Sequence, residues 1–224
     1  MGYSAMVVKG VGDTFNKTDY DIFKANHEAA GVAVVTTKGD IPAATGAQAI
    51  ARLGVGVAGT RLVPDAGQAT GLRWQIQPTC RVYNDAALDP AVGAWWTVTL
   101  NSERWDTNDM HSIVSNTSRL TIPTGGGGIY AIDGCAQFDT SEAGGNAHYF
   151  GIRVLLGGAT VIAQYGPAEH TMLTHDMGLA ISAQWSFAVA GYIELQVFTS
   201  VDINILSAGS FSPEFGATWL RVAP

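Results

Sequence analysis

Several features are scarce in this chain of 224 residues, and each scarcity excludes a class of protein. The two cysteines, Cys80 and Cys135, are too few for a disulfide framework and lack any zinc-binding spacing. No run of 18 apolar residues occurs, so we expect no membrane span. The first ten residues, MGYSAMVVKG, lack the basic region and apolar run of a secretory signal. We therefore expect synthesis in a cytoplasm, with both thiols reduced.

Charge is also scarce, because Asp, Glu, Lys and Arg together make up only 14% of the chain. About a quarter is typical of a soluble domain. The net charge is −7, and Lys and Arg form no cluster that could meet a phosphate backbone, so we predict no nucleic-acid partner. Hydrophobic residues reach 47%, a combination typical of a chain that hides surface in an oligomer. A chain that is merely rich in Gly and Ala is the simpler alternative.

From residue 79 onward, short apolar segments alternate with breaks rich in Gly, Asn or Asp. The clearest segment, 129–138, follows a run of four glycines and places Tyr130 and Ile132 on one face and Asp133 on the other. Short strands with frequent turns predict a β-sandwich or barrel. Gly157–Gly158 is the expected tip of a hairpin. The strands that we expect are 79–83, 95–100, 119–122, 129–138, 148–155, 159–165, 179–187, 192–199, 201–206 and 218–222.

The first 78 residues differ in character. One extended strand is expected over 5–9, and a helix over about 18–30, where acidic residues suit the N-terminus and Tyr20, Phe23 and His27 share one face. A helix this short is unstable alone in water, so we interpret it as an anchor that binds a partner. Residues 31–77 are fragments broken by Gly, Pro and Asp, of which only 47–53 could form a helical turn or two. We expect a linker, or a segment that is ordered against neighbouring copies.

The order of the later strands resembles the jelly roll of the globular head of complement subcomponent q and of tumour necrosis factor. That family begins a central strand with Gly-x-Tyr-x-Phe, and GIYAI stands at 128–132. Near its end the family has Gly-Asp-x-Val-x-Leu, which GYIEL at 191–195 resembles, while Asn108, Ile113 and Leu120 keep the spacing of an earlier strand. The resemblance covers about 79–224. It implies a jelly-roll β-sandwich head at the C-terminus and a homotrimer around a three-fold axis.

The N-terminal part has a resemblance of its own. TKGD at 37–40, RLGVGVAGTRLV at 52–63 and GLRW at 71–74 resemble a spacer common in fibre and tail proteins of tailed bacteriophages. There the spacer precedes a receptor-binding or decorating head. The sequence therefore predicts a mainly β chain with two parts, an anchor and spacer over 1–78 with one short helix and a jelly-roll head over 79–224.

No motif predicts catalysis or a cofactor. GVGVAG at 54–59 fits a dinucleotide-binding pattern but follows no strand and opens no helix. Asp106, Asn108 and Asp109 are candidate calcium ligands, although a solvated turn is the better interpretation. His170 and His175 lack metal-ligand spacing. We therefore predict no catalytic residue, no metal and no cofactor.

Two further predictions concern contacts made by strand residues. On the expected strand 192–199, Tyr192, Gln196 and Phe198 share a mixed aromatic and polar face, which we predict to be the trimer interface. Asp133 is a candidate partner for Arg153 in a structural ion pair.

The function expected from these features is a non-enzymatic structural protein of a tailed bacteriophage, at the virion surface. The leading role is a trimeric capsid decoration or head fibre, attached through its N-terminal segment to a major capsid protein or a tail protein. The first alternative is a tail-fibre tip or minor tail protein that binds a host surface glycan or protein receptor. A free bacterial lectin-like module is the second alternative. A glycan hydrolase is disfavoured, because the sequence shows no evident carboxylate pair.

Overall fold

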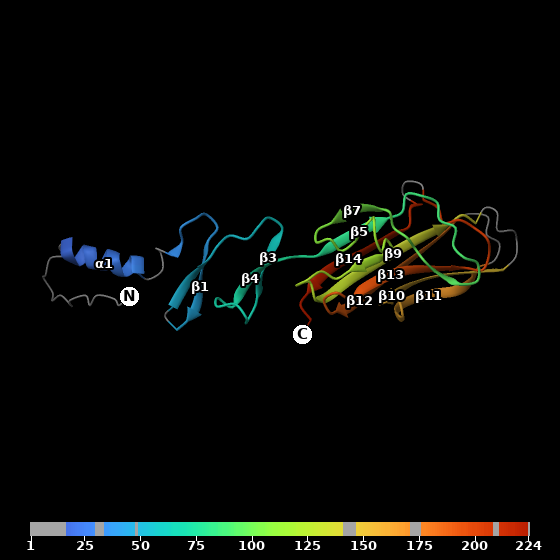
Figure 1. Cartoon of the computed structure of the whole chain (residues 1–224). Helices are drawn as coiled ribbons and strands as arrows, with labels where there is room; N and C mark the ends of the chain where they lie inside the picture. The colour runs from blue at the N-terminus through green and yellow to red at the C-terminus, as the bar shows by residue number, and fades with distance from the viewer. Residues whose placement is uncertain are drawn as a thin grey trace. The chain divides into compact units, whose positions relative to one another are not determined.

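The computed structural model describes residues 17–29, 34–47, 49–140, 147–170, 176–207 and 211–223. The chain divides into two compact units, residues 1–76 and residues 77–224 (Figure 1). The strand expected over 5–9 lies outside the described residues. No helix within the described ranges has both the length and the apolar character needed to cross a membrane.

The helix expected in the first unit is confirmed as α1, Lys17–Ala29. Asp19 stands in its first turn, and Lys17 Nζ lies 2.6 Å from the carboxylate of Asp21, one turn further along. Tyr20 and Phe23 are both exposed. The helix therefore presents these two aromatic rings to its surroundings, while the side chain of His27 lies outside what the structure describes.

Two β-hairpins follow the helix. β1 (Ile41–Gly46) pairs with β2 (Ala49–Leu53), and β3 (Thr60–Pro64) pairs with β4 (Leu72–Ile76), both antiparallel. The helical turn expected over 47–53 is therefore wrong. Five residues are too few for a stable helix, and the backbone groups of β2 are satisfied by pairing with β1 instead.

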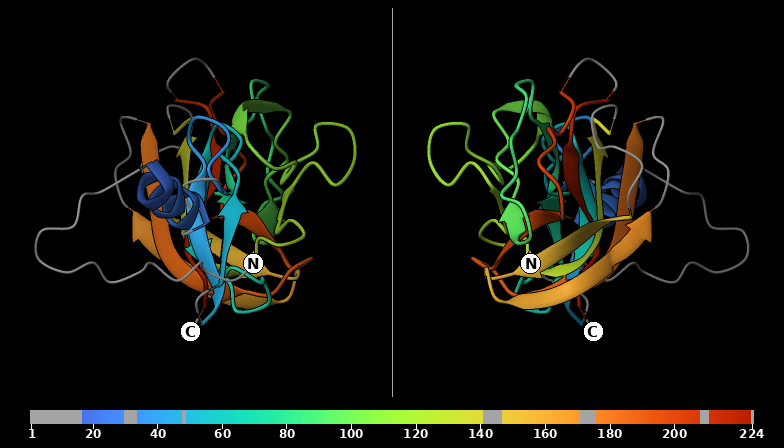
Figure 2. Two further views of the ribbon diagram at one scale, coloured as in Figure 1. Left: turned by 90° about the vertical axis from the view of Figure 1, so that its left-hand side faces the viewer. Right: turned by 90° about the vertical axis from the view of Figure 1, so that its right-hand side faces the viewer.

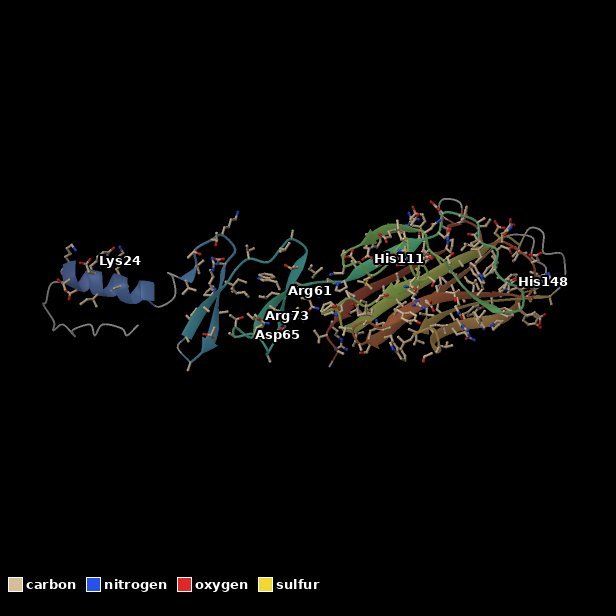
Figure 3. All side chains as sticks on the ribbon, in the orientation of Figure 1. Lys24, Arg61, Asp65, Arg73, His111 and His148 are labelled. Carbon is tan, nitrogen blue, oxygen red and sulfur yellow. The ribbon has the colours of Figure 1, made fainter. Side chains whose placement is uncertain are left out.

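Each hairpin holds one ion pair. Arg52 lies 3.4 Å from the carboxylate of Asp40 in the first, and Arg73 lies 3.1 Å from that of Asp65 in the second, where Figure 3 labels both residues. These ion pairs hold charged side chains of the hairpins in place, but they do not bury apolar side chains. Among residues 34–47 and 49–76, the residues buried as a whole are Ala43, Val63 and Gln75, and the side chain of Asp40 is buried as well.

The second unit is a sandwich of two five-stranded sheets (Figure 1, Figure 2). One has the order β12-β9-β14-β5-β7, made of β12 (Met177–Phe187), β9 (Gly128–Phe138), β14 (Glu214–Arg221), β5 (Thr79–Tyr83) and β7 (Ser102–Asp106). The other has the order β11-β10-β13-β6, with β8 also paired to β13; its strands are β11 (Thr160–His170), β10 (His148–Leu156), β13 (Tyr192–Thr199), β6 (Trp95–Thr97) and β8 (Arg119–Thr121).

The pairing of these strands is that of a jelly roll. All are antiparallel, and from β9 onward the chain changes sheet repeatedly, so that β12 and β14 lie in one sheet and β13 between them in sequence lies in the other. The jelly-roll β-sandwich expected for the head is thereby confirmed.

The core lies between the two sheets, and the alternation of β9 explains why. Along Gly128–Phe138 buried and half-buried residues alternate without exception, as expected from the sequence. Ile193, Leu195 and Val197 of β13 are fully buried opposite, so the aliphatic face of that strand belongs to the core. Gly134 lets the sheets approach, because a Cβ there would lie 2.8 Å from Leu195.

The glycines 125–128 carry the chain from one sheet to the other. β8, before them, pairs with β13, whereas β9, after them, pairs with β12 and β14. Gly125 has a φ of 76° and Gly128 one of 152°, which few other residues adopt. The stretch is therefore a crossing between layers, while the expected hairpin tip at Gly157–Gly158 is confirmed between β10 and β11.

Two strand predictions were wrong. β7 was not expected, because its sequence SERWD has no apolar alternation; the strand forms because it pairs with β5 along the edge of the sheet. No strand forms over 201–206. Ile203 and Ile205 are buried there, but only isolated bridges join Ile205 to Leu88 and Phe138, so the apolar pattern reflects burial without a ladder.

Candidate interaction surface

The sheet β12-β9-β14-β5-β7 turns one side to the core and the other outward, and we call the outward side the β9 face. Residues directly opposite in antiparallel strands point to the same side of the sheet, so the register identifies its members. On β9, β12 and β14 most of them are small: Ala131, Asp133, Cys135, Gly178, Ala180, Ser182, Gly216 and Thr218. Most side chains on these three strands therefore project little from the sheet.

Four charged side chains form a network at the centre of the β9 face. Arg81 on β5 donates from Nη1 to Asp133 and from Nε to Glu214, both at 2.5 Å. Arg104 on β7 donates from Nε to the other oxygen of Glu214 at 2.6 Å. Two cations therefore meet two anions, and the network is neutral as a whole.

Gly216 makes the network possible. It lies on β14 directly opposite Arg81 of β5 on one side and Asp133 of β9 on the other. A Cβ at Gly216 would lie 3.2 Å from the Asp133 carboxylate. The missing side chain leaves room for the guanidinium to reach across β14.

The network sets the ionisation of Glu214. Burial raises the pKa of this carboxyl, but the hydrogen bonds from Arg104 and Arg81 outweigh burial, so its pKa lies below the usual value. Glu214 is therefore held as a carboxylate between two guanidinium groups. This arrangement suits a structural ion pair better than a group that gives and takes protons.

Two shallow hollows adjoin the network and share Cys135 and Ala180. The first has a volume of about 340 Å³ and includes Asp133 and Ser182 in its lining. The second, of about 210 Å³, extends toward Phe211. Burial raises the pKa of Cys135, which favours the neutral thiol over the nucleophilic thiolate. The two hollows offer space for side chains of a contacting protein, but the Cys135 thiol in their lining is not activated as a nucleophile.

The other sheet also has an outward side, which we call the β13 face. Phe198 packs on Trp95 with ring centroids 5.7 Å apart, and the guanidinium of Arg153 lies 4.3 Å over the Trp95 ring. Gly151 lies beneath the same indole, since a Cβ there would come within 2.8 Å of it. Gln196 accepts a hydrogen bond from Arg153 at 2.8 Å. These side chains cover one another within a single chain.

Tyr192 has a similar environment at the end of β13. Arg119 lies 4.1 Å over its ring, and the Nε of Arg119 lies 3.2 Å from the carboxylate of Glu194. Tyr192, Gln196 and Phe198 thus share the β13 face, as their alternation requires, and each contacts a neighbour of the same chain. Their role between copies stays a prediction.

The expected pairing of Asp133 with Arg153 is wrong. The two residues lie on β9 and β10, which follow one another in sequence but belong to different sheets. Asp133 bonds Arg81, and Arg153 bonds Gln196.

The loop between β7 and β8, residues 107–118, is braced from within. The side chain of His111, labelled in Figure 3, is fully buried. Its ring nitrogens lie 3.0 Å from the Glu103 carboxylate and 3.1 Å from the Thr117 carbonyl. At the tip of this loop Ile113 and Val114 are exposed. The loop therefore holds two aliphatic side chains in water on a fixed base.

The candidate calcium ligands have a different role. The carboxylate of Asp106 accepts hydrogen bonds from the backbone N–H of Asn108 at 3.1 Å and of His111 at 2.8 Å, so it caps the loop. Asp89, Asp139 and Asp202, far apart in sequence, line a hollow of about 280 Å³. Within the described ranges, no three His, Cys, Asp or Glu residues are placed to hold a metal ion. His175 lies outside those ranges.

Sequence reasoning missed the charge network. Its members come from β5, β7, β9 and β14, and only the register of the folded sheet brings them together. The one local signal was the last strand, EFGATWLR, where Glu214, Gly216 and Thr218 alternate with the apolar residues Phe215, Ala217 and Trp219.

Comparison with known proteins found matches among solved structures. No family model and no curated protein matches the sequence. Among solved structures, the globular domain of a zebrafish complement 1qA protein matches with a TM-score of 0.48 and 13% identity, over 65% of this chain and 98% of that one. Murine APRIL matches with a TM-score of 0.46 and 7% identity, over 64% and 99%. The likeness is one of fold.

Proposed function

We propose that this chain is a non-enzymatic structural protein of a tailed bacteriophage, a homotrimer on the virion surface that decorates the capsid or forms a head fibre. The N-terminal unit attaches it to a major capsid protein or a tail protein, and the jelly roll is displayed. The observation that carries this proposal is the contrast between the two units. The head encloses a continuous core between its sheets, whereas the described part of the N-terminal unit has almost no core. Because the head has a core of its own, it does not need the first unit to fold, and the first unit can serve to attach the protein to the particle.

The ionisable groups of the head support a structural role. A glycan hydrolase needs two carboxyl groups that act as acid and as base or nucleophile. On the β9 face, Asp133 and Glu214 both accept hydrogen bonds from Arg81, and Glu194 on the β13 face is paired with Arg119. Carboxylates held in this way stabilise the sheet and are poorly suited to proton transfer.

The β9 face fits a contact between copies of the head better than the β13 face. On β9, β12 and β14 its side chains are mostly small, and the charges of its network are already neutralised within the chain, so burial of the network leaves no unpaired ion. On the β13 face, Trp95 and Phe198 are already partly covered by their own neighbours. The earlier prediction of an interface at Tyr192, Gln196 and Phe198 remains the alternative.

Three substitutions decide between the faces. Ala180→Arg places a long charged side chain on the β9 face, and we expect it to convert a trimer into single chains in light-scattering mass measurements. Tyr192→Asp tests the β13 face, where Arg119 can pair with the new carboxylate and keep the single chain folded. Thr160→Arg, at an exposed strand end, is the matched control. Dissociation by Tyr192→Asp alone would assign the interface to the β13 face, and a monomeric wild type would contradict the trimer.

Attachment is tested with virions. Particles from a strain complemented with the full chain should carry the protein, and particles complemented with residues 77–224 should lack it, although that fragment folds. Immunoblots of purified virions give the copy number, and circular dichroism of the purified fragment confirms its β structure. Incorporation of residues 77–224 at the normal copy number would refute attachment through the first unit.

One observation favours the second role, a tail-fibre tip or minor tail protein that binds a host receptor. The braced loop 107–118 holds Ile113 and Val114 in water, and exposed apolar side chains on a fixed loop are typical of binding sites. If the protein binds the host, Ile113→Asp with Val114→Asp should slow adsorption while incorporation stays normal. Electron microscopy of labelled virions then separates a capsid position from a tail position, and a protein found only free of particles would support the lectin-like module.

A further inference from the structure

We propose that a polar hollow on the loop between β7 and β8 binds one residue of a neutral sugar. We call it the loop hollow, and its polar side chains include Asp109, Ser112, Ser115, Asn116, Arg119 and Thr121. For its biological purpose the inference rests on the second role proposed above, binding of a host receptor, and it gives that role a ligand class. It concerns the head, so it can be tested with the purified chain.

The size of the loop hollow suits a small ligand. Its volume is about 270 Å³. Pockets for drug-sized molecules usually measure about 300–1,000 Å³, so this hollow has room for a single sugar ring. Ile113 and Val114, exposed between Ser112 and Ser115 of the lining, offer aliphatic contacts to the apolar C–H groups of such a ring.

Several side chains of the lining have hydrogen-bonding groups that no other described residue uses. The carboxylate of Asp109, the amide of Asn116 and the hydroxyl of Thr121 make no hydrogen bond to another described residue. Arg119 is bonded through its Nε, 3.2 Å from the Glu194 carboxylate, while its two Nη groups have no such partner among the described residues. The loop hollow therefore presents donors and acceptors together. A sugar hydroxyl both donates and accepts, so a ligand with several hydroxyls matches this mixture.

The positions of these side chains are fixed before a ligand binds. Asp109 and Asn116 have φ angles of 51° and 52°, and with Ala190 they are the non-glycine residues of positive φ in the described ranges. Residues in this conformation gather at ligand sites, and two of these three line the loop hollow. The guanidinium of Arg119 is stacked 4.1 Å over the Tyr192 ring. Donors and acceptors held in place in this way lose little freedom on binding.

Charge identifies the ligand as neutral. Among the Asp, Glu, Lys and Arg residues of the chain, Asp109 and Arg119 are the two in the lining, so their formal charges cancel. Three further carboxylates accept hydrogen bonds from residues of the lining, those of Glu103, Asp106 and Glu194. These carboxylates disfavour a phosphate or an acidic sugar, because like charges repel, and the guanidinium disfavours a cation in the same way. A neutral ligand rich in hydroxyls remains, which is the chemistry of a neutral sugar.

Saturation-transfer NMR with the purified full chain tests the inference. The neutral probes are glucose, galactose, mannose, rhamnose and N-acetylglucosamine, and the charged probes are glucuronate and glucosamine. We expect saturation to pass from the protein to at least one neutral sugar, and to neither charged probe.

A double variant locates the binding site. Asp109→Gly with Asn116→Gly removes the carboxylate and the amide but keeps the positive φ angles, which glycine adopts readily, so the head should stay folded. Binding of the neutral sugar should weaken by roughly tenfold or more, because hydrogen bonds of two side chains are lost. Thr121→Val removes a hydroxyl without a change of backbone and should weaken binding by roughly fivefold. Ala190→Gly makes the same backbone change outside the loop hollow, so this matched control should bind like the wild type.

The outcomes separate this inference from the proposed function. The inference is overturned if no neutral sugar receives saturation, if a charged probe is preferred, or if both Thr121→Val and the folded double variant bind like the wild type. If Ile113→Asp with Val114→Asp slows adsorption although no sugar binds, receptor binding stands and the ligand class is wrong. If a neutral sugar binds in the loop hollow while adsorption is unchanged in all these variants, the second role fails and the sugar site stands.

Discussion

Replacement of Arg81 by Met tests whether the charge network stabilises the head. Met keeps much of the length and the apolar stem of the side chain but removes the guanidinium group. The variant leaves Asp133 without its 2.5 Å partner and leaves Glu214 with Arg104 alone. The variant therefore measures what Arg81 contributes across β14.

The exposure of these side chains sets the loss of stability that we expect for Arg81→Met. Glu214 is 14% exposed and Arg81 is 29% exposed, so their hydrogen bond lies in the range of about 1.5–3 kcal/mol found for bonds to charged groups. Asp133 is 49% exposed, so its pair with Arg81 counts as a surface ion pair of about 0–1 kcal/mol. Because Glu214 keeps Arg104, we expect a loss near the lower end, about 2 kcal/mol in the free energy of unfolding at pH 7.

The loss should depend on pH in one direction. The pKa of Glu214 is lowered in the folded head from its usual value of 4.5. A carboxyl group whose pKa is lower in the folded than in the unfolded chain stabilises the fold. This stabilisation is fully present above the pKa of the unfolded chain, and it is lost as the pH falls through the pKa of the folded chain. The difference between wild type and Arg81→Met should therefore be full at pH 7 and shrink below pH 4.5.

Urea unfolding can be followed by tryptophan fluorescence at one protein concentration, at neutral and at acidic pH. It gives the loss of stability at pH 7 and its decrease in acid. Arg221→Met is the matched control, because this exposed arginine lies at the end of β14 away from the network. Its effect should stay within about 0.5 kcal/mol. An Arg81→Met variant as stable as Arg221→Met, or a difference that persists undiminished in acid, would refute the reasoning.

Two other predictions concern packing and thiols. Gly151→Ala should lower the free energy of unfolding by about 1–3 kcal/mol, because its Cβ would lie 2.8 Å from the Trp95 ring; Gly178→Ala, with no atom within 4 Å, is the control, and equal urea midpoints would contradict the packing argument. Alkylation without reductant should label both Cys135 and the buried Cys80 after unfolding, as read by intact mass. An unfolded chain that carries no label would reveal a disulfide instead.

The sequence predicted those parts of the fold whose cause is local. The alternation along 129–138 identified the central strand and both of its faces, because a strand half-buried in a sandwich must alternate. The helix at Lys17–Ala29 carried its acidic first turn, and Gly157–Gly158 marked a hairpin through its positive φ angles. Each of these signals lies within about a dozen neighbouring residues.

The parts that were missed depend on distant partners. β7 has no apolar pattern, and it forms because it pairs with the edge of β5. The hairpins of 41–76 contain few buried residues, so their sequence lacks the apolar alternation that would predict strands. The Arg81 network joins residues as far apart as 81 and 214, and it needs Gly216 to lie opposite both Arg81 and Asp133. Nothing in a single sequence states which strands become neighbours, so the wrong partner was expected for Asp133.

The place of β14 in its sheet has a consequence for the order of events during synthesis. This strand, Glu214–Arg221, lies between β9 and β5, and it follows all the other strands in the chain. Until the ribosome has released it, β5 and β9 both lack their shared neighbour, although α1 left the exit tunnel long before. The head therefore completes its fold only once β14 has been synthesised, through pairings of high sequence separation that form slowly. In a cell producing many copies at once, that delay exposes unpaired edges to one another, so lower temperature or added chaperones should raise the yield of folded protein.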